Sequence, residues 1–190
     1  MKKEKIITVF GSSRPQENDS EYKEARELGK ALGQAGFAIC SGGYGGVMEA
    51  VSRGAKEAGG KVYAVTADFF ARKANEWVDV EVRKKTWEER LFSLIELADG
   101  FVACKGGTGT LVELAVVWEM LNKSVITHKP FAVLGDFWQP ILDRVREVEQ
   151  GKPPSTDAPK WREAKVELVN SAKTPAEVVE YLAVHLKDGE

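Results

Sequence analysis

The part of the sequence that is most informative about the fold runs from Gly100 to Glu113 and reads GFVACKGGTGTLVE. Phe101 to Cys104 is a short apolar run, which is typical of a buried strand. Three glycines follow within four residues, and an apolar helix is predicted to open at Thr110. A strand, a glycine turn and a helix start together aim free backbone N–H groups and the positive end of the helix at an anion, usually a phosphate.

A tight turn between a strand and a helix that binds nothing has a similar glycine content. The spacing narrows the choice, because GGTGT lacks the lysine of a Walker loop and does not match the dinucleotide pattern G-x-G-x-x-G. We therefore predict a phosphate site of another kind. Its residues are Gly106, Gly107, Thr108, Gly109 and Thr110.

The composition of the chain narrows the class of protein and the kinds of partner. The chain has 190 residues, 43% hydrophobic and 29% charged, which is typical of one globular domain covering residues 1–190. Its formal charge of −2 argues against nucleic acid or an anionic membrane as partner. No apolar run reaches the roughly 18 residues that span a bilayer. Cys40 and Cys104 fit buried thiols in a reducing cytoplasm, and we expect neither a metal nor a cofactor.

Strands and helices alternate along the chain. The expected strands are Lys5 to Phe10, Phe37 to Cys40, Val62 to Val65, Val78 to Val82 (at an edge or half covered), Phe101 to Cys104, Phe131 to Leu134 and Val166 to Val169. This alternation predicts an α/β fold, a Rossmann-like three-layer arrangement with a mostly parallel sheet and helices on both faces. Ligands of such sheets bind at the carboxyl ends of the strands, where the strand order reverses. The loops expected there are Gly11 to Pro15, Ser41 to Gly46 and Lys105 to Thr110.

Two charged residues, Arg90 and Glu113, are candidates for a role in binding or catalysis. Arg90 falls inside the apolar arc of a helix predicted for Thr86 to Ala98, so its guanidinium either meets an anion or extends along the core to water. Glu113 either caps its own helix, in the pattern Thr110-x-x-Glu113, or is a half-buried carboxylate one turn from the phosphate turn. The two roles of Glu113 are compatible.

The helix from Leu111 to Leu121 is apolar on nearly every side, with only Glu113 and Glu119 as exceptions. Such a helix is buried all round, under a sheet, against another subunit, or both. We therefore expect a two-fold homodimer that packs this helix partly against its copy.

Taken together, these motifs resemble those of the LONELY GUY family of cytokinin-activating phosphoribohydrolases, long labelled lysine decarboxylase-like. The family signature PGGxGTxxE appears here as KGGTGTLVE, from Lys105 to Glu113. A helix motif with an essential arginine falls on Thr86 to Leu91, with Arg90 as that arginine. The Gly11–Ser13 turn and GGYGGVME, from Gly42 to Glu49, resemble two earlier motifs. The resemblance covers about residues 5 to 150.

The resemblance implies a Rossmann-like homodimer that hydrolyses the base–ribose bond of a nucleoside 5′-monophosphate. Arg90 and Glu113 match the catalytic pair of that family. The substrate would be bound by the glycine turn after the strand at Phe101 and by residues of the two earlier motifs. These further residues are Gly11, Ser12, Ser13, Gly42, Gly43, Gly45, Gly46 and Met48. The segment from Asp68 to Trp77 matches no family motif, and we expect it to shape the pocket for the base, which the sequence does not identify.

The chain departs from the family pattern at three points. Lys105 stands where the family has proline, and Leu91 where a lysine usually follows the essential arginine. The motif GGYGGVME is one residue shorter than the plant pattern, and this version is more similar to the related molybdenum-cofactor carrier proteins. A non-catalytic carrier of a nucleotide or of the molybdenum cofactor is therefore the alternative function.

Overall fold

The computed structural model describes residues 4–150 and 167–186, which are organised around a single sheet. Its strands are β1 (Ile6–Phe10), β2 (Ala38–Ser41), β3 (Val62–Ala67), β4 (Val80–Lys84), β5 (Gly100–Ala103), β6 (Phe131–Leu134) and β7 (Asn170–Ala172). They lie in the order β4-β3-β2-β1-β5-β6-β7, and every pair of neighbours is parallel. The mostly parallel sheet is confirmed, with β4 at an edge as predicted.

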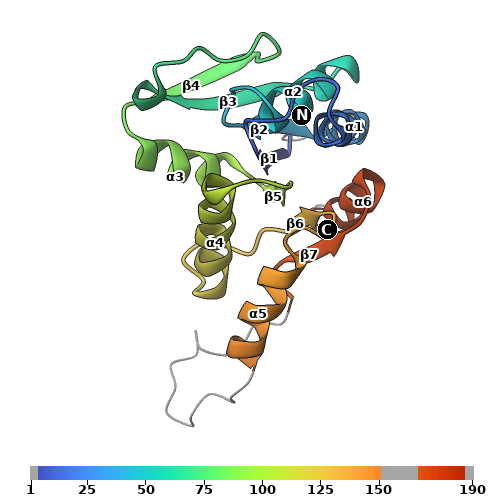
Figure 1. Cartoon of the computed structure of the whole chain (residues 1–190), viewed down its shortest axis with the longest axis vertical. Helices are drawn as coiled ribbons and strands as arrows, with labels where there is room; N and C mark the ends of the chain where they lie inside the picture. The colour runs from blue at the N-terminus through green and yellow to red at the C-terminus, as the bar shows by residue number, and fades with distance from the viewer. Residues whose placement is uncertain (1–3, 151–166, 187–190) are drawn as a thin grey trace.

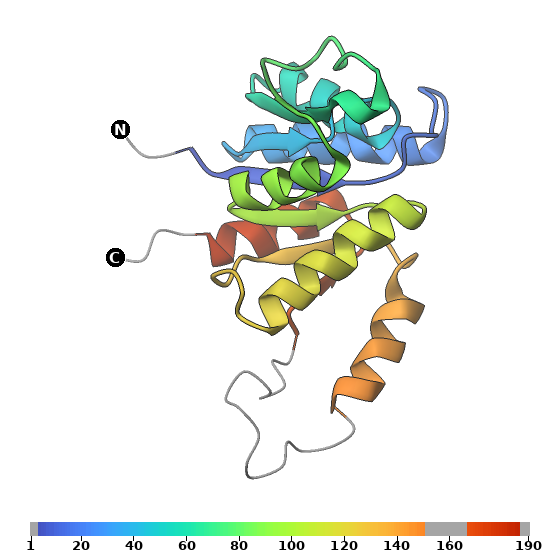
Figure 2. The ribbon, with the colours of Figure 1, turned by 90° about the vertical axis from the view of Figure 1, so that its left-hand side faces the viewer.

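Helices cover both faces of this sheet. They are α1 (Ser20–Gln34), α2 (Val47–Glu57), α3 (Trp87–Leu97), α4 (Thr108–Asn122), α5 (Gln139–Gln150) and α6 (Pro175–His185), with a 3₁₀ turn η1 (Asp68–Phe70). One face packs against α1, α2 and α6, and the other against α3, α4 and α5 (Figures 1 and 2). The three-layer α/β fold is therefore confirmed.

The strands supply each layer with alternate side chains, as the two-residue period of a strand requires. In β1, Ile7 and Val9 join the core under α1 and α2, whereas Phe10 joins the core under α3 and α4. Phe10 stacks on Phe101 of β5 with ring centroids 6.1 Å apart. The two central strands are thus fixed to each other by packing as well as by their ladder.

Strand β1 lies at the reversal of strand order. The chain runs outward from β1 through β2 and β3 to β4, then returns to place β5 on the other side of β1. The loops after β1 and β5 therefore start side by side at the carboxyl edge of the sheet, where ligands of parallel sheets bind.

Several element boundaries differ from prediction by one or two residues, and two differences are informative. Helix α4 begins at Thr108, with Gly107 as its N-cap residue, so Thr110 lies inside the helix and the alternative that Glu113 caps a helix starting at Thr110 is excluded. Leu168 and Val169 are buried but precede the ladder, because β7 pairs through Asn170 to Ala172. The predicted strand at Val166 to Val169 is therefore wrong for residues 167–169, although Leu168 and Val169 are buried as their apolar character suggests. Position 166 and the loop predicted at 152–161 lie outside the described residues.

The outer side of α4 is less covered than its sequence suggests. Leu114, Val117 and Leu121 are buried, whereas Val112 is 37% exposed. The homodimer expected from this helix stays a prediction. Across residues 4–150 and 167–186, every helix is too short or too polar to cross a bilayer.

Candidate functional site

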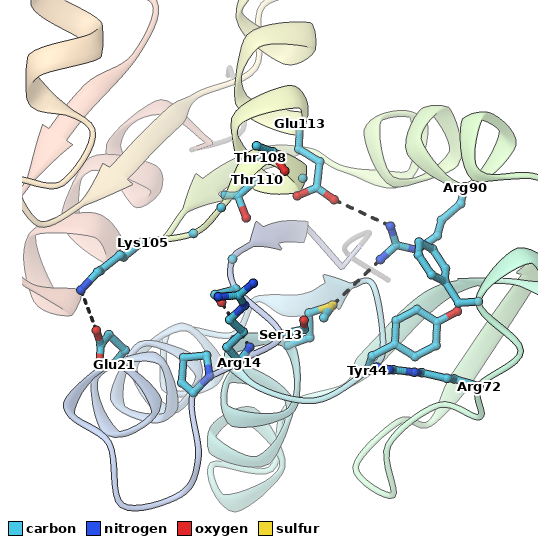
Figure 3. A pocket seen from close by; sticks show the side chains of 18 of the residues that line it. Ser13, Arg14, Glu21, Tyr44, Arg72, Arg90, Lys105, Thr108, Thr110 and Glu113 are labelled. Atoms are coloured by element: carbon cyan, nitrogen blue, oxygen red, sulfur yellow. Dashed lines mark hydrogen bonds and ion pairs between the residues drawn. The ribbon is translucent and has the colours of Figure 1, made fainter.

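A cavity of about 820 Å³ opens at the carboxyl ends of β1 and β5. Its walls come from the loop after β1, the glycine turn after β5 and the first turns of α2, α3 and α4. Arg90 and Glu113 both line it, as do Ser12, Ser13 and Thr108 (Figure 3). The structure thus brings residues from three separate sequence motifs into one site.

The glycine turn forms the amide-rich side of the cavity. No side-chain hydrogen bond from the described residues caps α4, so the first-turn amides after Gly107 keep their N–H groups for another acceptor. A Cβ at Gly107 or Gly109 would meet nothing within 4 Å, whereas one at Gly106 would lie 2.2 Å from Oγ1 of Thr110. Gly106 lets the turn fold onto the buried Thr110, and the other two glycines leave open space in front of the amides.

The loop after β1 closes the next side. Its position is fixed by two backbone bonds: the Ser12 N–H donates to the Lys105 carbonyl at 3.3 Å, and the Val47 N–H donates to the Ser12 carbonyl at 2.8 Å. A Cβ at Gly11 would lie 2.4 Å from Cγ1 of Val47, so this glycine permits the close approach of α2. Ser12, Ser13 and Arg14 line the cavity next to the glycine turn.

Arg90 has its guanidinium inside the protein, which removes the alternative that it extends to water. The residue is 6% exposed, and its Nε donates to the Val65 carbonyl at 2.9 Å. Nη2 lies 3.9 Å from Sδ of Met48, and Nη1 lies 3.7 Å from Oε1 of Glu113. Burial lowers the pKa of Arg90, and the charge of Glu113 opposes that shift. The group stays a cation, since arginine does not lose its proton in proteins.

Glu113 projects from the second turn of α4 toward Arg90 (Figure 3). Its side chain is 14% exposed, and burial raises the pKa of its carboxyl to about 7, against the opposing effect of Arg90. At 3.7 Å the two groups attract each other without a close hydrogen bond. The carboxylate therefore keeps acceptor capacity on the cavity side, and it changes charge near neutral pH.

The glycines of the second turn, after β2, lie behind the cavity wall, whereas Tyr44 between them lines the cavity. Of the residues predicted from its motif, only Met48 lines the cavity, and Gly42, Gly43, Gly45 and Gly46 do not. A Cβ at Gly42 would lie 1.6 Å from Nη2 of Arg90, and one at Gly46 would lie 2.4 Å from the Ser12 carbonyl oxygen. Two of these glycines thus make room for the arginine and for the loop after β1.

Two of the three departures from the family motifs, Lys105 and Leu91, can be described from their contacts in the structure. Lys105 turns away from the glycine turn, and its Nζ lies 2.7 Å from Oε1 of Glu21 on α1 (Figure 3). Leu91 is buried in the core under α3 and α4. Neither residue puts a new charge beside Arg90 or Glu113.

Sequence reasoning missed several residues that line the cavity: Arg14, Tyr44, Phe70, Arg72 and Trp87. Arg14 and Tyr44 stand inside loops that the glycine pattern had located, so their place next to a ligand was readable. Phe70 and Arg72 belong to the segment from Asp68 to Trp77 that is predicted to shape the pocket for the base, and the structure shows which of its side chains line the cavity.

Comparison with known proteins supports this picture. A family model described as the SLOG cluster4 family matches residues 4–156. A probable cytokinin riboside 5′-monophosphate phosphoribohydrolase of Oryza sativa subsp. japonica is 32% identical over 67% of this chain, and this chain spans about half (53%) of that protein. A cytokinin riboside 5′-monophosphate phosphoribohydrolase of Rhodococcoides fascians is 26% identical over 74% of each chain.

Among solved structures, the molybdenum cofactor binding protein of Rippkaea orientalis aligns with a TM-score of 0.76, at 22% identity, over 97% of this chain and 99% of that one. At this identity the likeness shows a shared fold. The family model covers most of the chain, and the two phosphoribohydrolases carry the name of the family that the motifs resemble. The chain therefore belongs to the SLOG cluster4 family, within the LONELY GUY or lysine decarboxylase-like proteins.

Proposed function

We propose that this protein hydrolyses the N-glycosidic bond of a nucleoside 5′-monophosphate, releasing the free base and ribose 5-phosphate. The observation that carries the proposal is the buried pair of Arg90 and Glu113, 3.7 Å apart, in the wall of a cavity that the open glycine turn also lines. Two relatives named as phosphoribohydrolases add support.

The 5′-phosphate would bind at the first-turn amides of α4. Backbone N–H groups and the helix dipole favour a phosphate there, and Gly107 and Gly109 leave room for it. Ser12 and Ser13 lie on the adjoining loop as further donors. A phosphate held at this end places the ribose toward Glu113, which lies one turn further along the same helix.

Bond cleavage develops positive charge on the ribose, since the electron pair of the C1′–N bond leaves with the base. An ionised Glu113 would stabilise this charge and accept a proton from the water that attacks C1′. The oxygen of that water becomes the 1′-hydroxyl, and the base takes up a proton as it leaves. Arg90 would hold Glu113 in place and stabilise negative charge on the departing base.

A carrier without catalysis is the second candidate, from a different functional class. Two features favour it: the short GGYGGVME motif and a fold shared with a molybdenum cofactor binding protein. A carrier would use the same amides and the same cavity to hold a phosphorylated ligand, and Glu113 would then take no part in bond cleavage.

A base-release assay on a panel of nucleoside 5′-monophosphates separates the two functions. For the hydrolase, Glu113→Gln keeps nucleotide affinity within a few-fold and slows base release by a factor on the order of 10² or more, because Glu113 acts mainly on the transition state. Thermal denaturation of both proteins is the control for folding. A wild-type protein that binds a nucleotide tightly and releases no base from any member of the panel is a carrier.

The pKa of Glu113 adds a pH signature to the same experiment. The folded protein holds this proton up to about pH 7, whereas an ordinary carboxyl loses it near 4.5. Base release should therefore rise with pH through about 7 and then level off, and the free energy of unfolding should fall between about 4.5 and 7. In Glu113→Gln both changes should be absent. A wild-type rate profile that is flat across pH 6 to 8 contradicts a catalytic Glu113.

A further inference from the structure

One wall of the cavity is aromatic. Tyr44, from the glycine-rich turn after β2, and Phe70, at the end of η1, both line the cavity and contact each other edge to face, with ring centroids 5.4 Å apart. The guanidinium carbon of Arg90 lies 5.6 Å from the centroid of Tyr44 and 5.5 Å from that of Phe70. The three side chains form a continuous surface of two rings and one planar cation, which is called the aromatic wall below.

The aromatic wall is held in place from behind. The Tyr44 hydroxyl accepts a hydrogen bond from the Ala67 N–H at 3.0 Å and donates to the Ala67 carbonyl at 3.3 Å. The Asn75 side-chain amide donates to the carbonyls of Gly43 and Tyr44 at 3.0 and 3.1 Å. The ring of Tyr44 is therefore fixed by partners that lie outside the cavity, so the wall exists without a ligand.

The segment that carries Phe70 is anchored at both of its ends. Asp68 pairs with Arg83 of the edge strand β4, and the Asn75 N–H donates to the Gly43 carbonyl at 2.7 Å. Between these anchors, Phe70 and Arg72 reach the cavity, whereas Phe69 is 72% exposed and does not line it. Two consecutive phenylalanines thus have different surroundings.

The position of the wall along the cavity identifies the part of the ligand that it meets. The glycine turn lies on one side of Glu113, and Arg90 with Tyr44 lies on the other (Figure 3). With phosphate at the turn and ribose beside Glu113, the group attached to C1′ faces the rings. A cavity of about 820 Å³ lies in the upper part of the range for small-molecule sites, so a sugar phosphate alone would leave this end unfilled.

We propose that the aromatic wall of Tyr44, Phe70 and Arg90 is the subsite for a flat heteroaromatic base, with Phe70 as the residue that sets the preference for a stacked ring. The proposal rests on the proposed function for the placement of phosphate and ribose. Aromatic rings and an arginine plane stack on bases of any sequence, and larger bases stack more strongly. A purine should therefore stack on this wall more strongly than a pyrimidine, and Phe70 should account for part of that difference.

The test measures affinity instead of turnover, in the Glu113→Gln background, where the nucleotide stays intact during titration. Calorimetry compares AMP, GMP and UMP with ribose 5-phosphate, which has no base. We expect the purine nucleotides to bind at least about tenfold more tightly than ribose 5-phosphate, with UMP between them. Equal affinities for ribose 5-phosphate and the nucleotides would overturn the proposal.

Three variants at neighbouring positions localise the effect. Phe70→Leu keeps an apolar side chain without a ring, and it should lower the preference for purine nucleotides about 5- to 100-fold while leaving ribose 5-phosphate unchanged. Phe70→Trp should retain the preference. Phe69→Leu makes the same change at the neighbouring exposed ring, which contacts Phe70 edge to face at 5.3 Å without lining the cavity, and it should change both affinities far less than Phe70→Leu.

The remaining outcomes also decide the matter. If Phe70→Leu weakens ribose 5-phosphate and nucleotides equally, the ring only supports Arg90 and the base subsite is elsewhere. If Phe69→Leu acts like Phe70→Leu, the segment contributes through its folding and the proposal is wrong. A wild-type protein that prefers purine nucleotides but releases no base keeps this inference and removes the hydrolase, so the two failures are distinguishable.

Discussion

The two glycine-rich turns of this protein look alike in sequence and differ in what the glycines do. After β5, a methyl group added to Gly107 or Gly109 would meet no atom within 4 Å, so the missing side chains leave space for a ligand. After β2, a methyl on Gly42 or Gly46 would overlap Arg90 or the loop after β1. One turn is open toward the cavity, and the other is filled by the protein itself.

A cluster of glycines therefore indicates that another group lies close to the backbone, but it does not identify that group. In the first turn the approaching group would be a phosphate, and in the second it is the guanidinium of Arg90 and the backbone of Ser12. The second turn still serves the site, since it sets where the arginine lies. Substitutions at single glycines can separate these two uses.

The largest expected effect is the loss of stability when Gly46 is substituted. This residue has φ of 69° and ψ of −133°, a conformation open almost only to glycine, and a Cβ would lie 2.4 Å from a backbone oxygen. Gly46→Ala should lower the free energy of unfolding by about 3 kcal/mol or more, which is about 6–12 °C in Tm. Gly45→Ala is the control, because its added methyl meets only ordinary contacts at 3.8 Å. Equal melting temperatures for both variants would show that the turn after β2 does not require glycine at position 46.

The next effect concerns ligand binding without loss of fold. Gly107 has φ of −95° and open space in front of it, so Gly107→Val should keep the melting temperature within a few degrees. The new side chain would occupy the space before the α4 amides, and nucleotide binding should fall below detection in calorimetry. Gly107→Ala should give an intermediate loss. Normal binding by the valine variant would show that the anion binds elsewhere.

The smallest of the three effects is expected at Gly42, and it falls on catalysis. The added methyl of Gly42→Ala would meet only the flexible ends of Arg90 and Met48, so the fold should persist while the guanidinium moves. A displacement of about 1 Å at a catalytic group can cost about 10²-fold, so base release should slow by about 10- to 100-fold at little change in phosphate affinity. Unchanged turnover would show that the exact place of Arg90 does not matter.

Much of the fold was predictable because local patterns and the sheet agree. The alternation of apolar runs and helical periods gave the parallel sheet, and the acidic alternation around Val80 placed β4 at an edge. The start of α4 was not predictable from propensity: Thr110 looks like a cap, but Gly106 permits the turn to tighten over it, and the helix starts two residues earlier. That contact depends on the three-dimensional path of the turn.

The same contrast holds at the site. Arg90 and Glu113 were found because each is a charged residue in an apolar helix, and the structure brings them within 3.7 Å. The segment from Asp68 to Trp77 was predicted to shape the base pocket, but the contact of Phe70 with Arg90 was not predictable, since it depends on the pairing of β3 with its neighbours. Sequence patterns located the charged chemistry, and tertiary contacts supplied the surface beside it.

The central position of β1 has a consequence for how the chain folds during synthesis. The Ile6 N–H donates to the Asp99 carboxylate, a contact that spans 93 residues. Until β5 has emerged from the ribosome, β1 has a partner on one side only, and the face of Phe10 that stacks on Phe101 stays uncovered. Contacts so distant in sequence close late and slowly. A nascent chain that ends before β5 therefore carries an open edge on β1 and no ligand site, and open strand edges of this kind are prone to aggregation.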